Sequence, residues 1–455
     1  MRCFTVNYNS LNGILSPLFF ISQPQDTKNF IPLSKIALVN PNRQKPQLGL
    51  DEAVPYVGLP ETDDGEIKEI LYRPYREVKG RSIFKENDIL FARIEPSVFN
   101  QKYIYADGLR DNNYAFTSTE FYVVKAKEDV DSKFIFYMFF TNPVFEQIKG
   151  KTTGSTGRRR LDKGSFENLL IPFPNKEIRA KVVEILDQAQ RQREEKLKQA
   201  DELLNSIDGY VSQQLGIDYT EPREEKIYIV NSKDLEGNRQ DPYYYNPKFA
   251  LAIKEIRKSR YKTEKLENVI NTLTSGQRPK GGVRIAEGNV VSIGGEHILD
   301  DYSIATNNLR FITSTFHKKH LASKTNKNDI FIVKDGATTG KVGIMPNDYP
   351  YNEVNINEHI FLIRAKKNVN PYYLFIFLKS HLGKIQIEQQ ISGGTVTGIT
   401  REATKNLIII MPPLSIQTSI AQEVRKRIYE AKKLKTNANT VLEEAKRKVE
   451  QMILN

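Results

Sequence analysis

Two long stretches of the chain carry apolar residues at steps of three and four among charged residues, the pattern of an amphipathic helix with a narrow apolar stripe. The helices are predicted within residues 176–220 and 413–455, and each follows a short apolar run that prolines end. Asn175 and Ser415 stand where an N-cap is expected. The stripes consist of Val182, Leu186, Ala189, Ala200, Leu203, Ile207 and Val211 in the first helix and Ile420, Val424, Ile428, Ala431, Ala438, Leu442, Ala445 and Val449 in the second.

The two stretches are copies of one pattern, because the same shift in residue number places Pro174 on Pro412 and Asn168 on Asn406. A helix of roughly forty residues is about 60 Å long. Its single apolar stripe is stable in water only when another surface covers it, and the other copy is the most economical cover. We therefore expect two globular heads held apart by two helices that pack together.

Short runs of β-branched and aromatic residues, separated by Gly, Pro, Asn and Asp, fill residues 30–120 and predict a β-rich head. One helix is predicted at 132–149. The same order returns in the second half, where NKNDIFIVKDG from Asn326 matches KENDILFARIE from Lys85. The predicted domains are the first head at 1–175, the first helix at 176–220, the second head at 221–412 with a polar connector at 221–262, and the second helix at 413–455.

The charge of the chain favours a polyanionic partner. The 455 residues carry a net charge of +12, with a pI of about 9.3. On charge alone, nucleic acid or an anionic membrane surface is about as good an explanation as a solvated lysine-rich surface. Cys3 is the only cysteine, so an internal disulfide is impossible, which suits a cytoplasmic protein. Polar residues interrupt the apolar patch at 14–21, which argues against a cleaved signal, and no apolar run reaches the roughly eighteen residues of a membrane span.

Candidate catalytic motifs are weak. The sequence GATTGKV at 336–342 has three residues between its glycines and Val342 after the lysine, so it departs from the phosphate-binding P-loop and more simply makes a turn that presents Lys334 and Lys341. The DPYY sequence at Asp241 lacks the second proline of the D-P-P-Y motif of amino-methyltransferases. The five histidines show no recurring ligand spacing.

An acidic and basic triplet, Asp63 with Glu66 and Lys68, is similar to the carboxylates that hold Mg²⁺ in metal-dependent nucleases. Such triplets arise often by chance in a chain that is 27% charged, so a chance grouping is the favoured interpretation.

Several polar and basic loops are candidates for DNA contact. Arg158, Arg159 and Arg160 lie in a Gly, Ser and Thr loop just before the first long helix. Arg binds phosphate and guanine edges well, although a charge run is often only solvated. The other candidates are Arg93, Asn100, Gln101, Lys102, Gln277, Arg278, Lys280, Lys334, Lys341, Thr395, Thr397, Thr400 and Arg401. Tyr243, Tyr244 and Tyr245 could touch sugar and phosphate, but aromatics beside a connector more often pack as a satellite cluster.

The most specific segments are TGSTGRRRLDKGSFENLLIPFPNKEI at 153–178 and SGGTVTGITREATKNLIIIMPPLSIQ at 392–417, supported by NDILFARIEPSVFN at 87–100 and NDIFIVKDGATTGKVGI at 328–344. With these segments the chain resembles the specificity subunit of type I restriction-modification enzymes. The resemblance covers nearly the whole chain and is weakest at 1–27 and 216–262.

The resemblance implies an α+β fold with a pseudo-two-fold internal repeat. Two similar target-recognition domains, β-rich with peripheral helices, would be separated by two long antiparallel coiled-coil helices. Each domain would read one half of a bipartite, asymmetric site in double-stranded DNA, and half-sites on one face of DNA lie about 34 Å apart.

The family also implies partners. The helices would bind two methyltransferase subunits, and an ATP-driven translocating endonuclease subunit can join the complex. S-adenosylmethionine, ATP and Mg²⁺ would belong to these partners, with no cofactor, metal or catalytic residue in this chain and no membrane contact. The residues expected at the partner-binding helices are Val182, Leu186, Leu203, Ile207, Ile420, Val424, Leu442 and Val449.

Two other classes of function stay open. One is an enzyme complete in one chain, a site-specific nuclease or methyltransferase that would use Asp63 or Glu66. The other is a coiled-coil scaffold whose basic heads bind protein or membrane, or a subunit of another methyltransferase-linked defence system.

Overall fold

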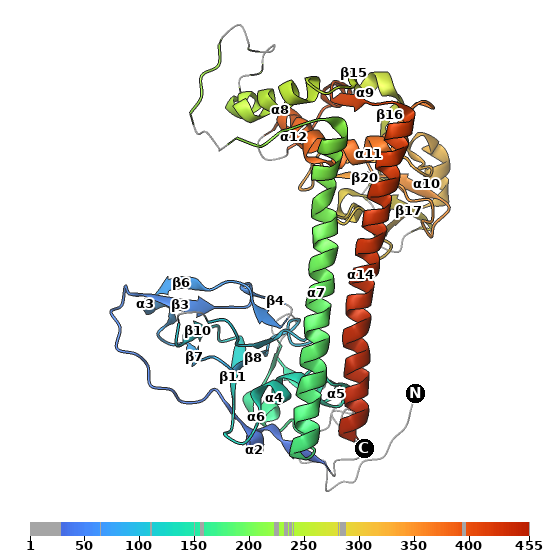
Figure 1. Cartoon of the computed structure of the whole chain (residues 1–455). Helices are drawn as coiled ribbons and strands as arrows, with labels where there is room; N and C mark the ends of the chain where they lie inside the picture. The colour runs from blue at the N-terminus through green and yellow to red at the C-terminus, as the bar shows by residue number, and fades with distance from the viewer. Residues whose placement is uncertain are drawn as a thin grey trace. The chain divides into compact units, whose positions relative to one another are not determined.

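The computed structural model describes residues 29–454 apart from residues 64, 110–111, 150, 155–158, 223–226, 232–234, 236–238, 240, 281, 283–287 and 394–396. The chain divides into two compact units. The first unit comprises Met1–Glu195 and Asn437–Asn455, and the second comprises Lys196–Thr436. Two long helices, α7 (Lys176–Leu215) and α14 (Leu414–Leu454), each contribute one segment to either unit (Figure 1).

The first unit is built on two four-stranded sheets. One is antiparallel with strand order β2-β11-β8-β9, and the other has the order β6-β3-β10-β7 with β3 and β10 parallel. The strands of the first sheet are β2 (Ala37–Val39), β11 (Phe121–Ala126), β8 (Ile89–Ala92) and β9 (Tyr103–Tyr105). Those of the second are β6 (Leu71–Pro74), β3 (Ala53–Val57), β10 (Ala115–Thr117) and β7 (Ser82–Phe84). Three strand pairs complete the unit, β1 (Phe30–Pro32) with β14 (Leu170–Pro172), β12 (Thr152–Thr153) with β13 (Arg160–Leu161), and β4 (Thr62–Asp63) with β5 (Glu66–Ile67).

Aromatic side chains fill the core between the antiparallel sheet and its helices. The rings of Phe91 and Tyr103 stack 4.1 Å apart, and those of Tyr122 and Phe166 stack 5.0 Å apart. All four side chains are fully buried, so they remove large apolar areas from water, the main driving force for folding. The short helices of the unit are α2 (Leu33–Ile36), α3 (Tyr75–Val78), α4 (Ser132–Met138), α5 (Asn142–Ile148) and α6 (Lys163–Glu167).

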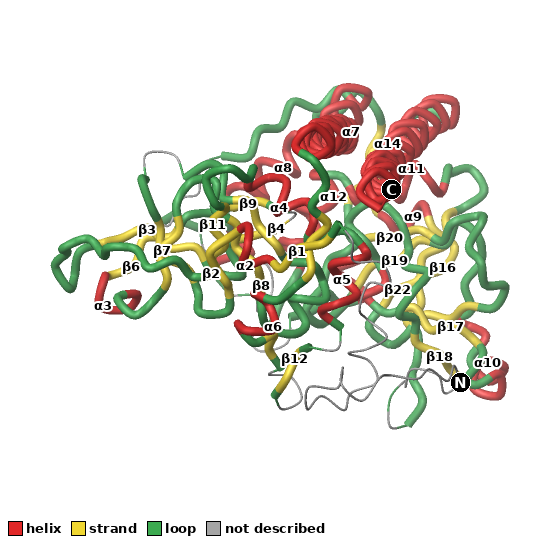
Figure 2. The backbone as a smooth tube through the Cα atoms, turned by 90° about the horizontal axis from the view of Figure 1, so that it is seen from below, coloured by secondary structure: helices red, strands yellow, loops and turns green. Residues whose placement is uncertain are grey.

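The second unit repeats this topology, which confirms the internal repeat. Its antiparallel sheet has the order β16-β22-β19-β20, and a three-stranded sheet has the order β18-β17-β21 with β17 and β21 parallel. Figure 2 shows strands and short helices in both units. The strands are β15 (Lys262–Lys265), β16 (Ile270–Ser275), β17 (Val290–Ile293), β18 (Arg310–Ile312), β19 (Ile330–Val333), β20 (Val342–Ile344), β21 (Val354–Ile356), β22 (Ile360–Ala365) and β23 (Ile408–Met411), of which β15 and β23 pair. The helices are η3 (Pro242–Tyr245), α8 (Pro247–Arg257), α9 (Leu266–Val269), η4 (Gly295–His297), α10 (Ser314–Lys319), η5 (Leu321–Ser323), α11 (Pro371–Lys379), α12 (His381–Gln390) and α13 (Arg401–Lys405).

The repeat extends to individual hydrogen bonds. In the first unit the buried Gln147 amide donates to Leu170 O at 2.8 Å and accepts from Leu170 N at 2.9 Å. In the second unit Gln386 makes the same pair with Ile408, at 3.0 and 2.8 Å. Each glutamine thereby ties a helix to the strand that leads into a long helix.

Of three local predictions, two need correction and one is confirmed. The single helix predicted at 132–149 is broken into α4 and α5. Pro143 lies in the first turn of α5, where its missing N–H costs nothing. Asn175 caps α7 as predicted, since its side chain accepts from Ile178 N at 3.0 Å. Ser415, however, lies inside α14, which already begins at Leu414.

The connector predicted at 221–262 holds more structure than its polarity suggested. It contains η3 and α8, and Phe249 and Ile256 of α8 are buried. Phe249 and Ile256 are seven residues apart, about two helical turns, so their side chains lie on one apolar face.

Within each unit the segments of α7 and α14 pack against the head and against each other. Val182 of α7 and Val449 of α14 share the core of the first unit. In the second unit Arg427 Nη1 donates to Ser206 O at 3.1 Å and Lys435 Nζ lies 2.9 Å from Asp201 Oδ1, so residue numbers rise along one helix as they fall along the other.

This packing covers much of the apolar stripes. Among the residues expected at the partner-binding helices, those buried in the cores of this chain are Val182, Leu186, Ile207, Ile420, Val424 and Val449. The heads and helices of this chain cover these side chains, and their part in binding a partner stays a prediction. Leu203 and Leu442 are only partly buried.

Candidate nucleic-acid interface

In the first unit, a hairpin brings three predicted arginines to one place. The β12–β13 hairpin lies beside the end of β8, where Leu161 N donates to Arg93 O at 2.9 Å and Glu95 N donates to Arg159 O at 3.0 Å. Arg93, Arg159 and Arg160 are therefore neighbours although about 65 residues separate the first from the others. Arg158, the remaining arginine of the run, lies outside the described residues.

The three arginines differ in their surroundings. Arg160 forms a two-point ion pair with Glu120, at 2.9 and 2.6 Å, which raises the pKa of the guanidinium and lowers the pKa of the carboxyl. Arg93 lies with its guanidinium 4.9 Å from the centre of the Tyr122 ring. Arg159 donates to Thr152 O at 2.8 Å, its Nε lies 3.7 Å from Glu95 Oε1, and its side chain is 45% exposed. Its ion pair is longer than that of Arg160 and its side chain is more exposed than the 36% of Arg160, so Arg159 is the more accessible of these two arginines.

Asn100 and Lys102 belong to a different surface. With Gln101 they line a cleft of about 1030 Å³ between the head and the helix segments of the first unit. Basic residues in the same lining are Lys102, Lys133, Arg191, Arg193 and Lys446, and acidic ones are Asp63, Glu66, Asp107, Asp187, Glu194 and Glu443. Because the acidic residues of this lining outnumber the basic ones, this cleft is a weaker match to a phosphate backbone than the arginine hairpin.

In the second unit, Lys334, Thr397 and Arg401 line one pocket of about 460 Å³. Ile399 N donates to Lys334 O at 2.7 Å, which joins the loop after β19 to the loop before α13. Arg401 Nη1 donates to Leu273 O at 2.7 Å. The pocket therefore gathers predicted residues from two segments into one polar surface, where Lys334 Nζ lies 3.5 Å from Asp335 Oδ2.

The other predicted residues of the second unit lie apart from this pocket. Lys341 pairs with Asp300 at 3.2 Å. Arg278 and Lys280 line a shallow pocket of about 530 Å³ in the loop after β16, and Gln277 beside them is exposed. Glycine is required at the start of this loop, because a Cβ at Gly276 would lie 2.1 Å from Ile356 O. Thr395 lies outside the described residues.

A charged network in the second unit was missed by the sequence reasoning. His359 contacts Asp335 through Nδ1 and lies 3.1 Å from Glu358 Oε1 through Nε2, while Arg278 Nε lies 2.9 Å from the same carboxylate. These residues come from three loops, so spacing along the chain gave no signal. Only the β-sheet topology brings them together.

The tyrosines at 243–245 pack as a satellite cluster, as the alternative interpretation held. Tyr244 is buried, with its ring 5.0 Å from that of Tyr245. Tyr243 stacks edge-on against Phe249 at 5.5 Å.

The triplet that is similar to nuclease carboxylates lies on and beside two short paired strands. Asp63 and Glu66 pair across β4 and β5, and Glu66 forms an exposed ion pair with Lys68 at 2.8 Å. Among the described residues, no three His, Cys, Asp or Glu side chains are grouped so that they could hold a metal ion. Within the residues that the structure describes, no helix is long and apolar enough to cross a membrane.

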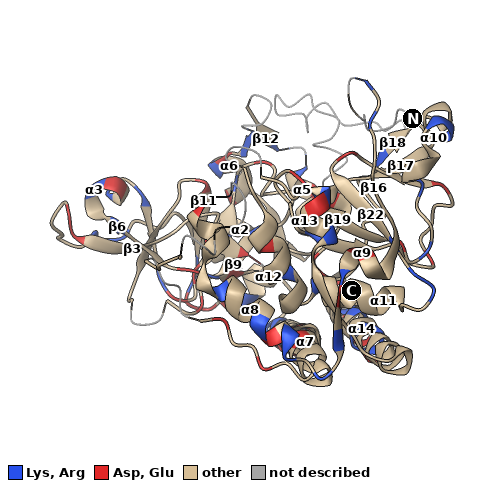
Figure 3. Ribbon diagram, turned by 90° about the horizontal axis from the view of Figure 1, so that it is seen from above, with Lys and Arg blue, Asp and Glu red and all other residues tan. Residues whose placement is uncertain are grey.

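Charge is spread over the long helices as well as the heads. Figure 3 shows Lys and Arg on α8 and α10 and both signs of charge along α7. Two units of one topology define a class of protein with two similar α+β domains on one chain. The profile of the type I restriction modification DNA specificity domain matches residues 33–203 and 258–444, and the chain belongs to this family.

Individual relatives support the assignment. The chain is 30% identical over 147 residues to the type I restriction enzyme EcoAI specificity subunit of Escherichia coli, and 21% identical over 304 residues to the MjaIX specificity subunit of Methanocaldococcus jannaschii. These alignments cover 31% and 66% of this chain, and 24% and 63% of the relatives. The chain therefore spans less than two thirds of the relatives it matches.

The fold is shared with a solved chain from a study of complex assembly and conformational transition of the type I R-M system. The TM-score is 0.52 at 16% sequence identity, and the alignment covers 94% of this chain and 98% of the other. At this identity the likeness concerns the fold alone.

Proposed function

We propose that this chain is the DNA-specificity subunit of a type I restriction-modification complex. Each unit's head would read one half of a bipartite, asymmetric DNA site. The observation that carries the proposal is the double match of one DNA-specificity family to a chain whose two heads share their topology. A repeated recognition domain on one chain fits a site with two half-sites.

The differences between the heads support an asymmetric site. The first head presents Arg159 on a strand hairpin, whereas the second presents Lys334 and Arg401 around a pocket. Lysine and arginine would supply affinity through phosphate contacts, and neighbouring polar side chains would read base edges in the grooves. Since the two loop sets differ in residues and shape, the half-sites should differ as well.

The long helices would form an antiparallel coiled coil that sets the distance between the half-sites and carries two methyltransferase subunits. Because most of the apolar stripe is buried in the chain's own cores, partners would bind the outward faces of α7 and α14, and the stripe would act by holding the helices straight. Catalysis, with S-adenosylmethionine, ATP and Mg²⁺, would belong to the methyltransferase and to any endonuclease subunit.

Methylation mapping tests this function. DNA from cells that express this chain with the methyltransferase encoded beside it is compared with DNA from cells without this chain. The expected result is one new methylated motif with two short half-sites around an unspecified spacer. The absence of any new motif, despite a stable complex, would refute the proposal and favour a scaffold role.

A domain exchange tests the division of labour. Replacement of residues 263–405 by the same region of a relative should change one half-site and leave the other intact. A change in both half-sites would contradict the assignment of one half-site to each head.

A further inference from the structure

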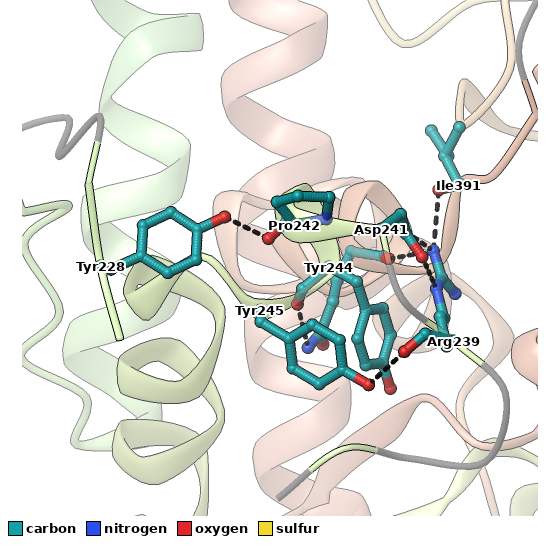
Figure 4. Close-up of polar contacts among 8 residues, drawn as sticks. Tyr228, Arg239, Asp241, Pro242, Tyr244, Tyr245 and Ile391 are labelled. Carbon is teal, nitrogen blue, oxygen red and sulfur yellow. Dashed lines mark hydrogen bonds and ion pairs between the residues drawn. The ribbon is translucent and has the colours of Figure 1, made fainter. Parts of the chain in front are cut away.

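A compact polar cluster joins the connector to the end of α12 (Figure 4). The Arg239 guanidinium pairs with both Asp241 oxygens, at 2.8 and 3.2 Å, and lies 4.0 Å from the centre of the Tyr244 ring. Arg239 O accepts from Tyr245 OH at 2.9 Å. We name Arg239, Asp241, Tyr244 and Tyr245 the connector clamp.

The connector clamp binds the C-terminal end of α12 through hydrogen bonds. Arg239 Nη2 donates to Gln389 O at 3.3 Å and to Ile391 O at 3.1 Å, and Ile391 is the C-cap of α12. The last carbonyls of a helix have no partners within it, and a cation there complements the helix dipole. Asp241 holds the guanidinium in the required plane, and the hydrogen bond with Arg239 lowers the pKa of Asp241.

Further contacts fix the same helix turn. Gln389 Nε2 donates to Tyr244 O at 3.3 Å, and Lys248 Nζ lies 2.7 Å from Glu388 Oε1. The end of α12 is thus held by the connector through both backbone and side-chain atoms.

The recognition loop, residues 397–400, is tied to the residue that follows this helix turn. Ser392 comes directly after the C-cap Ile391, and Ser392 and Gly398 exchange backbone hydrogen bonds at 2.9 and 2.8 Å. Thr397 and Thr400 of the loop line the same pocket as Arg401. Through Ser392, the position of α12's last turn therefore sets the position of the loop's entry.

We propose that the connector clamp positions the recognition loop of the second head, and that Arg239 is a positioning residue for the second half-site that does not touch DNA. This inference rests on the proposed DNA-specificity function. Without Arg239 the Gln389 and Ile391 carbonyls lose their donor and Asp241 loses its partner, so the entry of the loop becomes free to shift. Base contacts are sensitive to such shifts because hydrogen bonds weaken steeply with angle.

The test uses the full-length chain in its purified complex with the methyltransferase. Dissociation constants are measured for duplexes with the intact site, with a substitution in the first half-site, and with a substitution in the second. In Arg239→Ala the discrimination at the second half-site should fall by about tenfold, the order expected when a charged hydrogen bond is lost. Discrimination at the first half-site should stay as in the wild type.

Arg260→Ala is a matched control. Arg260 Nη2 also donates to a carbonyl near the end of a helix, Gln214 O of α7 at 3.1 Å, and its guanidinium lies 5.0 Å from the centre of the Tyr261 ring. The Arg260→Ala variant loses the same charge and the same kinds of contact in the same unit. Its discrimination at both half-sites should nevertheless stay as in the wild type. Arg239→Lys keeps the charge but cannot span Asp241 and two carbonyls, so its effect should be intermediate.

Hydrogen exchange of the DNA-free complex gives a second readout. In Arg239→Ala the amides of Ser392, Gly398 and Ile399 should exchange faster, while those of β22 should not change. Retained discrimination at the second half-site would overturn the inference, and so would an equal loss at both half-sites or an equal effect of Arg260→Ala. A wild-type complex that prefers neither half-site would instead refute the proposed function, and the inference would fall with it.

Discussion

Replacing Gln386 by Leu would remove the amide that ties α12 to β23. Gln386 is 4% exposed and donates to Ile408 O at 3.0 Å and to Leu382 O at 3.1 Å, while its Oε1 accepts from Ile408 N at 2.8 Å. Leucine is close in volume and leaves no large cavity. The change therefore isolates the loss of hydrogen bonds from the loss of packing.

The cost follows from the two backbone groups of Ile408 that lose their partner. A buried polar group left unsatisfied costs about 1–3 kcal/mol. Two such groups give about 2–6 kcal/mol, reduced slightly by the apolar area that leucine buries. This is a large part of the roughly 5–15 kcal/mol that stabilises an ordinary domain, so the variant should fold but open locally.

The internal repeat supplies a reciprocal variant for this experiment. Native-state hydrogen exchange with mass spectrometry follows β15 and β23 in the second unit and β1 and β14 in the first. Gln386→Leu should lower protection only in the second pair, and Gln147→Leu, which breaks the same bonds to Leu170, should lower it only in the first. A loss under about 1 kcal/mol, or a loss of equal size in both pairs for either variant, would refute the reasoning.

Three further predictions concern charge. Because Arg160 lowers the pKa of Glu120, their pair should stabilise the protein at pH values above the ordinary carboxyl pKa, and this stabilisation should disappear as the pH falls through the lowered pKa. Between pH 7 and pH 4 the melting temperature should therefore fall less in Glu120→Gln than in the wild type. An equal fall in both proteins would contradict the pairing. Lys334→Ala should weaken DNA binding for all sequences and reduce the slope of log affinity against log salt by about 0.9, whereas an unchanged slope would remove Lys334 from the phosphate contacts. Burial lowers the pKa of Lys379 to about 8, so Lys379→Met should raise the melting temperature at pH 7. This difference in melting temperature should shrink from pH 8 to 10, because there the folded wild type has lost the proton that its unfolded chain retains. A difference that stays constant with pH would contradict the burial effect.

The features readable from sequence were those that repeat. The helical spacing of apolar residues and the prolines before it predicted both long helices. The matched segments around Lys85 and Asn326 predicted two heads of one fold. Local breaks were harder to see. Apolar residues continue through 132–149, so the stop between α4 and α5 rests on Pro143 alone, and the burial of Phe249 depends on a surface that α12 provides.

The types of the candidate site residues were predictable from the sequence. Which of their side chains are already held by other residues of the chain was not. The arginine run was visible, yet only the fold shows that Arg160 is held by Glu120, a residue forty positions away. Other contacts also join segments that lie far apart in the sequence. His359 pairs with Asp335, and Arg239 donates a hydrogen bond to Ile391 O. Such contacts are set by tertiary topology, on which a single sequence carries little information.

The first unit is discontinuous in sequence, which has a consequence for its biosynthesis. Its core includes Val449 and Ile453 from the end of the chain, packed with Leu33 and Val182 from the beginning. At the usual rates of about 5–20 residues per second, the ribosome adds this last segment on the order of ten to fifty seconds after residue 195. The second unit, which is contiguous, can be completed in the interval. The first unit can therefore complete its core only after the second unit has been synthesised.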